Sequence, residues 1–162
     1  MKLLAQYRAL QERAEFPGWA IRPFVAEIGG LIAEFKSRTV LDYGCGMGWQ
    51  YSKEKASAGW GITPTLYDPA VATHDILPAG PFDGVICTDV AEHVPEEELD
   101  EMFANISGRA GQWAFISVCC RPAKRTFADG SNVHVTIRPF AWWQAMLAPY
   151  FTDARLVLRE TK

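Results

Sequence analysis

The fold follows from one stretch of sequence, Val40-Leu41-Asp42-Tyr43-Gly44-Cys45-Gly46-Met47-Gly48. Apolar residues lead into an acid, three glycines follow at alternate positions, and polar residues come next. This order predicts a buried parallel strand over residues 39–43, a tight turn and a helix over residues 47–58. Glycine permits backbone angles that are closed to other residues and lets a ligand lie against the main chain. Because a helix N-terminus favours negative groups, the turn is a candidate site for a ligand with a carboxylate or a phosphate.

The spacing of the glycines separates two classes of cofactor. A dinucleotide-binding fingerprint that begins at Gly44 and Gly46 needs a third glycine at position 49, where the chain has Trp49. The pattern Asp-x-Gly-x-Gly-x-Gly instead resembles the first motif of the class I S-adenosylmethionine-dependent methyltransferases. The resemblance implies that the amino-acid end of S-adenosyl-L-methionine is held by Asp42, Gly44, Cys45, Gly46 and Gly48.

Length, composition and charge are typical of one globular domain. The chain has 162 residues, 49% of them hydrophobic, and a net charge of −3. This charge gives no global basic field for nucleic acid, although a local basic patch, and with it a nucleic-acid acceptor, stays open. The cysteines show no C-x-x-C spacing and are expected as reduced thiols in a cytoplasmic protein. No apolar run is long enough for a membrane span, and the N-terminal residues are not typical of a signal peptide.

Two helices are expected before the first strand, within residues 1–36. Apolar residues recur at helical spacing over residues 2–15, and Pro23 suits the first turn of a second helix. These helices are expected either to pack over the sheet or, as in proteins that this chain resembles, to form a lid over the cofactor. Residues 39–160 then form the cofactor-binding core of a single domain, residues 1–162.

A second strand is expected over residues 62–67, and it ends at Asp68. An acid at the end of the second strand of a βαβ unit is positioned to hydrogen-bond ribose hydroxyls. Too few residues separate Asp68 from Asp75 for the helix and third strand that related methyltransferases place there. We therefore expect that unit to be deleted, which leaves a sheet in the family's order 2-1-4-5 plus one last strand. The resemblance places Asp75 near the adenine of the cofactor.

A second stretch resembles the family's fourth strand and the turn after it: Phe82-Asp83-Gly84-Val85-Ile86-Cys87-Thr88-Asp89-Val90-Ala91-Glu92-His93-Val94-Pro95. We expect a strand over residues 84–88, with a ligand-binding edge at its carboxyl end. The elements expected after it are a helix from Pro95, a strand over 113–120, an irregular segment over 121–138, a helix from Pro139 and a strand over 154–158. The irregular segment carries Arg121, Lys124 and Arg125 and is expected in the substrate pocket.

Together these elements predict a three-layer α/β fold of the Rossmann-like methyltransferase type with a mostly parallel sheet. The fold is reduced, because the third-strand unit is missing and the usual C-terminal strand pair is shortened. The shortened sheet edge could pair with a second subunit, and the sequence does not otherwise define the oligomeric state.

The reaction implied by the resemblance is transfer of a methyl group to an oxygen or nitrogen nucleophile. Transfer from a sulfonium is an in-line displacement, so the protein must align the nucleophile and exclude water. A hydroxyl or amine acceptor also needs a base, and histidine suits that role near neutral pH. The candidate catalytic residues are Asp89, Glu92, His93 and His134. The Glu-His pair resembles small-molecule methyltransferases of the ubiquinone and menaquinone pathways, which implies a small-molecule acceptor.

A metal-assisted reaction is an alternative. Asp89-x-x-Glu92-His93 with the distant His134 resembles an acid-x-x-Glu-His arrangement in two metal-dependent groups, the small-RNA 3′-terminal 2′-O-methyltransferases and the ubiquinone O-methyltransferases. Asp89 has a shorter side chain than the glutamate usual there. In this alternative the four residues hold Mg²⁺ or a softer divalent ion, which polarises a ribose or catechol hydroxyl.

Two other classes of function stay open from the sequence. An NAD(P)-dependent oxidoreductase is disfavoured by Trp49, and bound NAD would establish it. A non-catalytic methyltransferase-like module that binds a partner is compatible with the reduced fold, whereas the intact acids and glycines of the turn count against it. Cofactor binding without transfer to any acceptor would indicate such a module.

Overall fold

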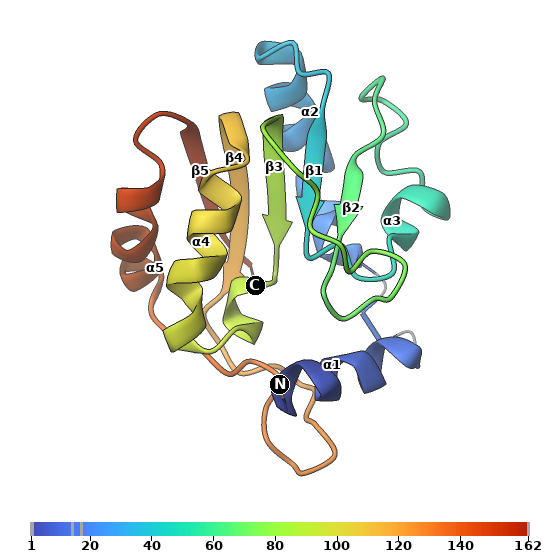
Figure 1. Cartoon of the computed structure of the whole chain (residues 1–162), viewed down its shortest axis with the longest axis vertical. Coiled ribbons are helices and arrows are strands. Elements are labelled where there is room, and N and C mark those ends of the chain that lie inside the picture. The colour runs from blue at the N-terminus through green and yellow to red at the C-terminus, as the bar shows by residue number, and fades with distance from the viewer. Residues whose placement is uncertain (1, 14, 17, 162) are drawn as a thin grey trace.

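The computed structural model describes residues 2–13, 15–16 and 18–161. It contains a five-stranded sheet in the order β2-β1-β3-β4-β5, and all neighbouring strands run parallel (Figure 1). The strands are β1 (Val40–Tyr43), β2 (Thr65–Tyr67), β3 (Phe82–Thr88), β4 (Ala110–Cys119) and β5 (Arg155–Thr161). The predicted α/β class and strand order are confirmed, and the sheet is wholly rather than mostly parallel.

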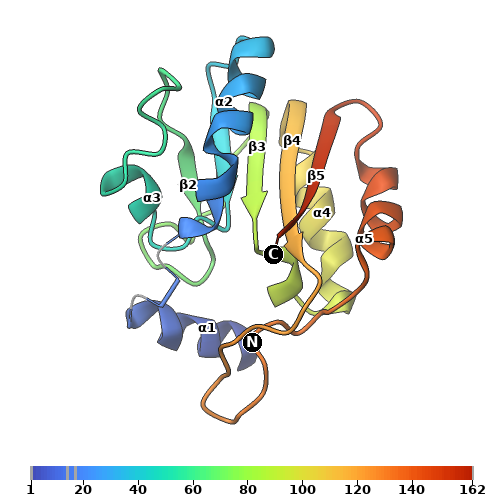
Figure 2. The same cartoon turned by 180° about the vertical axis from the view of Figure 1, so that it is seen from behind.

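Helices cover both faces of this sheet. α2 (Val25–Glu34) lies on one face (Figure 2). α4 (Leu99–Ser107) and α5 (Phe140–Leu147) lie on the opposite face (Figure 1). This arrangement gives the three layers that the sequence predicts.

The sheet is buried on both faces, and β4 shows why its sequence is a nearly continuous apolar run. Trp113 and Phe115 belong to the hydrophobic cluster that includes α2. Ala114 and Ile116, which alternate with them, belong to the cluster that includes α4 and α5. Because successive side chains of a strand point to opposite faces, a strand covered on both sides must be apolar throughout.

The third-strand unit is absent, as predicted. Residues 69–81 join β2 to β3 directly and contain turns but no helix or strand. As a consequence β2 forms one edge of the sheet and β5 forms the other.

The two N-terminal helices lie in different places. α2 is a packing layer, whereas α1 (Lys2–Glu12) crosses the carboxyl edge of the sheet, beside the irregular segment 121–138 (Figures 1 and 2). A small hydrophobic cluster joins α1 to that segment through the buried residues Leu10, Phe127 and Val133. α1 therefore lies where a lid would lie, and its role as a lid stays a prediction. Ala14, inside the predicted first helix, is outside the described residues.

Some elements differ in length from the prediction. α3 (Trp49–Ser52) is shorter than the predicted helix over 47–58, and Lys55 adopts a left-handed backbone with φ of 53°. β2 begins at Thr65 rather than at residue 62, because Pro64 lacks an N–H group and cannot donate to a strand ladder. β4 begins earlier and β5 ends later than predicted.

Candidate functional site

The glycine turn joins β1 to α3 and is tightly packed. Gly44 and Gly46 have φ of 84° and 57°, in the region that favours glycine. A Cβ atom at Gly44 would lie 2.3 Å from Val90 Cγ2, and one at Gly46 would lie 2.4 Å from the Phe16 carbonyl oxygen. The N–H groups of Gly44 and Cys45 both donate to the Tyr67 carbonyl, which ties the turn to β2.

Asp68, at the end of β2, holds the same turn from its carboxylate. One oxygen accepts a hydrogen bond from the Gly46 N–H and the other accepts one from the Ala70 N–H, both at 2.8 Å. Asp68 is 8% exposed, and this burial raises the pKa of its carboxyl against the lowering effect of the two hydrogen bonds. Asp68 therefore fixes the turn and also lines the cavity described below.

Asp42 supports the turn from beneath. Its Oδ2 accepts hydrogen bonds from Gln50 Nε2 at 3.0 Å and from the Tyr51 hydroxyl at 2.7 Å. Burial raises the pKa of Asp42 from 3.8 to about 6. This buried network anchors the start of α3, and Asp42 is not among the residues that line the cavity.

The predicted cofactor residues fall into two groups, those that line the cavity and those that do not. Gly44, Gly46 and Asp68 line the cavity, whereas Cys45 and Gly48 belong to the same turn but do not line it. The Cys45 thiol is buried and donates to the Gly46 carbonyl. Asp75 is exposed, and its carboxylate lies 4.0 Å from the Arg8 guanidinium. The structure thus brings together the turn residues and Asp68, whereas the Asp75 side chain is not part of the cavity lining.

A cavity of about 1350 Å³ occupies the carboxyl edge of the sheet, between the glycine turn, the ends of β3 and β4, α1 and the segment 121–138. A drug-sized ligand occupies a pocket of roughly 300–1,000 Å³. The cavity therefore has room for a nucleoside cofactor and an acceptor together. Its mixed lining of glycine backbone, carboxylates and apolar side chains fits S-adenosyl-L-methionine, which carries an adenine, a ribose and an amino acid.

His93 lines this cavity from the turn after β3. Its Nδ1 lies 3.0 Å from the Val133 carbonyl oxygen and 3.2 Å from the Tyr7 hydroxyl, which itself donates to the same carbonyl at 2.5 Å. Because a carbonyl oxygen only accepts, Nδ1 carries the proton, and Nε2 has no hydrogen-bond partner among the described residues. Burial and the neighbouring His134 lower the pKa of His93 to about 4, so the ring is neutral at pH 7.

Tyr7 was not predicted as part of the site. Its spacing on α1 matches an apolar helix face, and its ring does pack against Phe127 with centroids 5.0 Å apart. Only the fold reveals that its hydroxyl reaches Val133 and His93. Burial raises the pKa of the Tyr7 hydroxyl, so it stays protonated and donates.

Glu92 and Asp89 both follow β3, but Glu92 is fully buried whereas Asp89 lines the cavity. Glu92 is fully buried, its Oε1 accepts the Cys119 N–H at 2.8 Å, and burial raises its pKa to about 8. Asp89 lines the cavity, and its Oδ1 accepts a hydrogen bond from the Thr161 hydroxyl at 2.9 Å. Burial also raises the pKa of Asp89.

The four residues predicted as an alternative metal set are not held together as one group. Among the described residues, the donors that converge are Glu92, Cys119 and His134, whose ligand atoms lie within 4.8 Å of one another. Asp89 and His93 are held by other partners. Cys119 was missed, because its place in an apolar strand is typical of a core residue. The metal role of the predicted set stays a prediction.

Basic residues lie at the outer wall of the cavity, as predicted for the segment 121–138. Arg121, Lys124 and Arg125 all line it. Arg125 is paired with the Glu15 carboxylate at 3.0 Å and lies over the Phe16 ring. Arg121 and Lys124 therefore supply positive charge to this wall of the cavity.

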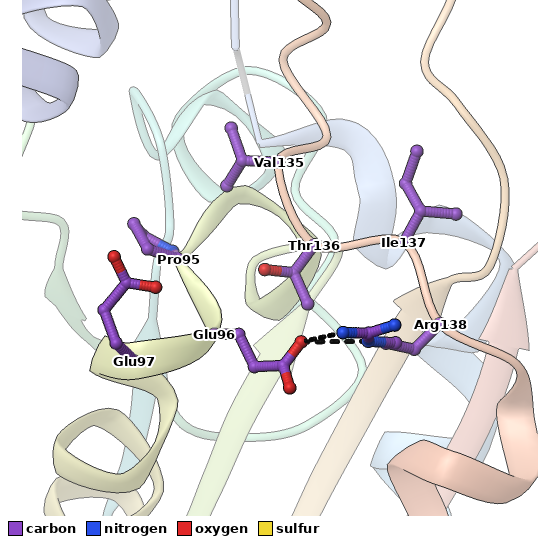
Figure 3. Close-up of a pocket in the computed structure, with 7 residues that line it drawn as sticks. All are labelled: Pro95, Glu96, Glu97, Val135, Thr136, Ile137 and Arg138. Carbon is purple, nitrogen blue, oxygen red and sulfur yellow. Dashed lines mark hydrogen bonds and ion pairs between the residues drawn. The ribbon is translucent and has the colours of Figure 1, made fainter.

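A second, smaller pocket of about 420 Å³ lies where the same segment leaves the cavity (Figure 3). It is lined by residues 95–97 and 135–138. Figure 3 shows the Arg138 guanidinium pointing to the Glu96 carboxylate, with which it makes two hydrogen bonds. Glu96 and Arg138 thus neutralise each other, and most of the residues predicted for the chemistry line the larger cavity instead.

The sequence matches the family described as "Methyltransferase domain" over residues 12–155. Because this match covers most of the chain, the protein belongs to the methyltransferase domain family, whose members are enzymes that use S-adenosyl-L-methionine. No significant match was found among curated proteins or among solved structures. The finer resemblance to enzymes of the ubiquinone and menaquinone pathways finds no support in these comparisons. Within the part of the chain that the structure describes, no helix has both the length and the apolar character needed to cross a membrane.

Proposed function

We propose that the protein transfers the methyl group of S-adenosyl-L-methionine to an oxygen or nitrogen atom of a small-molecule acceptor, with His93 as the general base. The observation that carries this proposal is the orientation of His93. Its Nδ1–H is fixed on the Val133 carbonyl, and it lines the cavity with Nε2 unpartnered among the described residues. A neutral imidazole held in this way can accept a proton from a bound nucleophile.

The cofactor is expected at the glycine turn. Gly44 and Gly46 line the cavity at the turn, and Asp68 is the acceptor suited to the ribose hydroxyls. Its oxygens each already accept one backbone hydrogen bond, but a carboxylate oxygen has a second lone pair for a hydroxyl. When bound, the cofactor supplies a methyl group on a sulfonium, which is already activated toward displacement. Asp42, Cys45 and Gly48 are expected to act by holding the shape of the turn.

The acceptor is expected between the turn and the wall formed by α1 and the segment 121–138. His93 and Asp89 line this part of the cavity, and Tyr7 and Phe16 close it from the N-terminal side. Enclosure by these elements excludes water and aligns the nucleophile, which can supply roughly 7–11 kcal/mol of the barrier reduction. A hydroxyl or amine becomes more acidic as it attacks the methyl group, so a weak base such as His93 suffices.

Two measurements test this proposal. The first is a calorimetric titration with S-adenosylhomocysteine, with NAD as the control ligand. The second is transfer of labelled methyl groups to a panel of phenols, catechols and amines. We expect saturable binding of S-adenosylhomocysteine only, and transfer to at least one acceptor class.

The variant His93→Asn isolates the base. An asparagine amide can still donate to the Val133 carbonyl, but the ring nitrogen Nε2 is lost. We expect unchanged binding of S-adenosylhomocysteine and transfer reduced by roughly 10²–10⁴-fold. The control is Tyr150→Phe, which removes a hydroxyl that bonds Asp100 outside the cavity and should change neither quantity.

Three outcomes would contradict the proposal in different ways. If His93→Asn transfers methyl groups at the wild-type rate, His93 is not the general base. If the label is found only in RNA or protein, the acceptor is not a small molecule. Binding of S-adenosylhomocysteine with no transfer to any acceptor indicates a non-catalytic module.

A further inference from the structure

Three donor atoms of different chemistry meet in the wall of the cavity. They belong to Glu92, Cys119 and His134, and they lie within 4.8 Å of one another. In a tetrahedral zinc site, bond lengths of about 2.0–2.3 Å place neighbouring donors about 3.5 Å apart. The three donor atoms are therefore at most about 1.3 Å farther apart than neighbouring donors in such a site. We propose that Glu92, Cys119 and His134 form a binding site for a soft divalent transition-metal ion such as zinc.

An unsatisfied buried oxygen is the second observation that points to a cation here. Glu92 is fully buried, and its Oε1 accepts the Cys119 N–H at 2.8 Å. Its Oε2 has no hydrogen-bond partner within the described residues. A buried polar atom without a partner is uncommon and costs free energy, so its presence requires an explanation. A metal ion bound by Glu92, Cys119 and His134 would satisfy this oxygen.

The main chain already orients each of the three donors. His134 Nδ1 lies 2.6 Å from the Arg121 carbonyl oxygen and therefore carries the proton, which leaves Nε2 as the lone-pair donor. The Cys119 thiol also points to the Arg121 carbonyl, at 3.7 Å. Metal-binding histidines commonly donate their other N–H to a carbonyl or carboxylate, because that bond fixes the ring. The His134 contact is therefore of the kind found around metal sites, whereas the Cys119 contact is given up when the thiol loses its proton.

The donor set selects the kind of ion. A thiolate, an imidazole and a carboxylate suit zinc, cobalt(II) or copper, whereas Mg²⁺ prefers oxygen ligands only. When the ion binds, the thiol and the carboxylic acid each release a proton, and the two resulting negative charges neutralise a divalent ion. This set differs from the four-residue set suggested by resemblance, because it includes Cys119 and omits Asp89 and His93.

The site would have one open position. Three protein ligands leave the fourth position of a tetrahedral ion free. Cys119 and His134 both line the cavity, whereas Glu92 lies behind them. The free position therefore faces the cavity, where a hydroxyl, a thiol or water can bind. This location places the ion within the space assigned to the acceptor.

Cobalt(II) provides the sharpest test, because thiolate ligation gives it a charge-transfer absorption that does not depend on activity. The whole chain is freed of metal with a chelator and titrated with Co²⁺, and then with Zn²⁺ in competition. We expect one ion per chain, a thiolate-to-cobalt band, and loss of that band as zinc replaces cobalt. A chain that binds neither ion at one-to-one stoichiometry overturns the proposal.

The adjacent cysteines supply a matched pair of variants. Cys119→Ser should remove the charge-transfer band and weaken binding at least tenfold, whereas Cys120→Ser should keep both. Glu92→Gln keeps an oxygen for the Cys119 N–H, and His134→Asn keeps a donor for the Arg121 carbonyl, so both variants should fold while binding the metal at least tenfold more weakly. Circular dichroism checks the fold of each. A band that survives in Cys119→Ser but not in Cys120→Ser contradicts the assignment.

Parallel titrations separate this proposal from the proposed methyl transfer. A chain that binds S-adenosylhomocysteine but no metal overturns the metal site alone. A chain that binds zinc but no S-adenosylhomocysteine overturns the proposed function alone. Binding of Mg²⁺ that is unaffected by Cys119→Ser, together with absence of zinc binding, indicates an oxygen-donor site and also overturns the proposal.

Discussion

Replacement of Asp68 by asparagine should both weaken the binding of the cofactor and destabilise the glycine turn. The carboxylate accepts hydrogen bonds from the Gly46 and Ala70 N–H groups, both at 2.8 Å. Asparagine has only one acceptor oxygen, so one of these buried N–H groups faces an amide donor instead. An unsatisfied buried donor destabilises a protein by about 1–3 kcal/mol. We therefore expect Asp68→Asn to lower the free energy of unfolding by about that amount.

The same substitution removes the charged acceptor for the ribose hydroxyls. A hydrogen bond to a charged group contributes about 1.5–3 kcal/mol, and 1.4 kcal/mol corresponds to tenfold in affinity. S-adenosylhomocysteine should therefore bind Asp68→Asn roughly 10- to 150-fold more weakly than it binds the wild type. Calorimetric titration measures this loss, and urea unfolding of the same samples measures the stability.

Asp83→Asn is the matched control. The Asp83 carboxylate also accepts two backbone N–H groups, those of Arg38 and Thr39, but it lies at the opposite edge of the sheet. Both N–H groups donate to the same oxygen, Oδ2, so the single oxygen of asparagine can still accept them. Asp83→Asn should therefore lose less stability than Asp68→Asn and keep its affinity for S-adenosylhomocysteine. Wild-type affinity in Asp68→Asn, measured on folded protein, would refute the assignment of Asp68 to the ribose.

Three further predictions concern the sheet, the base and the buried acid. Gly84→Ala should destabilise the fold by at least the roughly 1–3 kcal/mol typical of overpacking, because its Cβ would lie 2.1 Å from the buried Trp113 ring. Chemical denaturation measures this loss, and wild-type stability of the variant would contradict the prediction. Tyr7→Phe keeps the ring but removes the hydroxyl beside His93, so we expect kcat to fall while the affinity for S-adenosylhomocysteine is unchanged. A kcat equal to that of the wild type would contradict a role of Tyr7 in positioning His93. Asp42 keeps its proton to about pH 6 when folded but loses it near pH 4 when unfolded, so its contribution to stability falls as pH rises through this range. Relative to wild type, Asp42→Asn should therefore gain about 2 kcal/mol of unfolding free energy between pH 4 and pH 7, and a pH-independent difference would contradict the raised pKa.

The framework of the fold could be predicted because it depends on local patterns. The glycines after Asp42 and the short interval between Asp68 and Asp75 determine where strands end and which unit is absent. These patterns place polar residues at one edge of a parallel sheet, independently of the conformation of the loops. The short α3 was not predicted, because its sequence has no strong stop signal before residue 59.

The contacts that make the candidate site depend on long-range packing, and they could not be predicted. The local sequence around Cys119 predicts an apolar strand. His134 comes close to Cys119 only because the segment 121–138 folds back over the end of that strand. Tyr7 reads as an apolar face of α1, and its polar contact needs that helix to cross the sheet edge. Hydrophobic periodicity carries no information about which distant loop a side chain will meet.

The small hydrophobic cluster of Leu10, Phe127 and Val133 is separate from the two clusters that flank the sheet. Proteins open in cooperative units whose opening free energies fall below that of global unfolding. We therefore expect α1 and the segment 121–138 to open as one such unit while the sheet stays intact. Amide hydrogens in both should exchange together, ahead of those in β3 and β4. We expect release of the spent cofactor to require the opening of that unit.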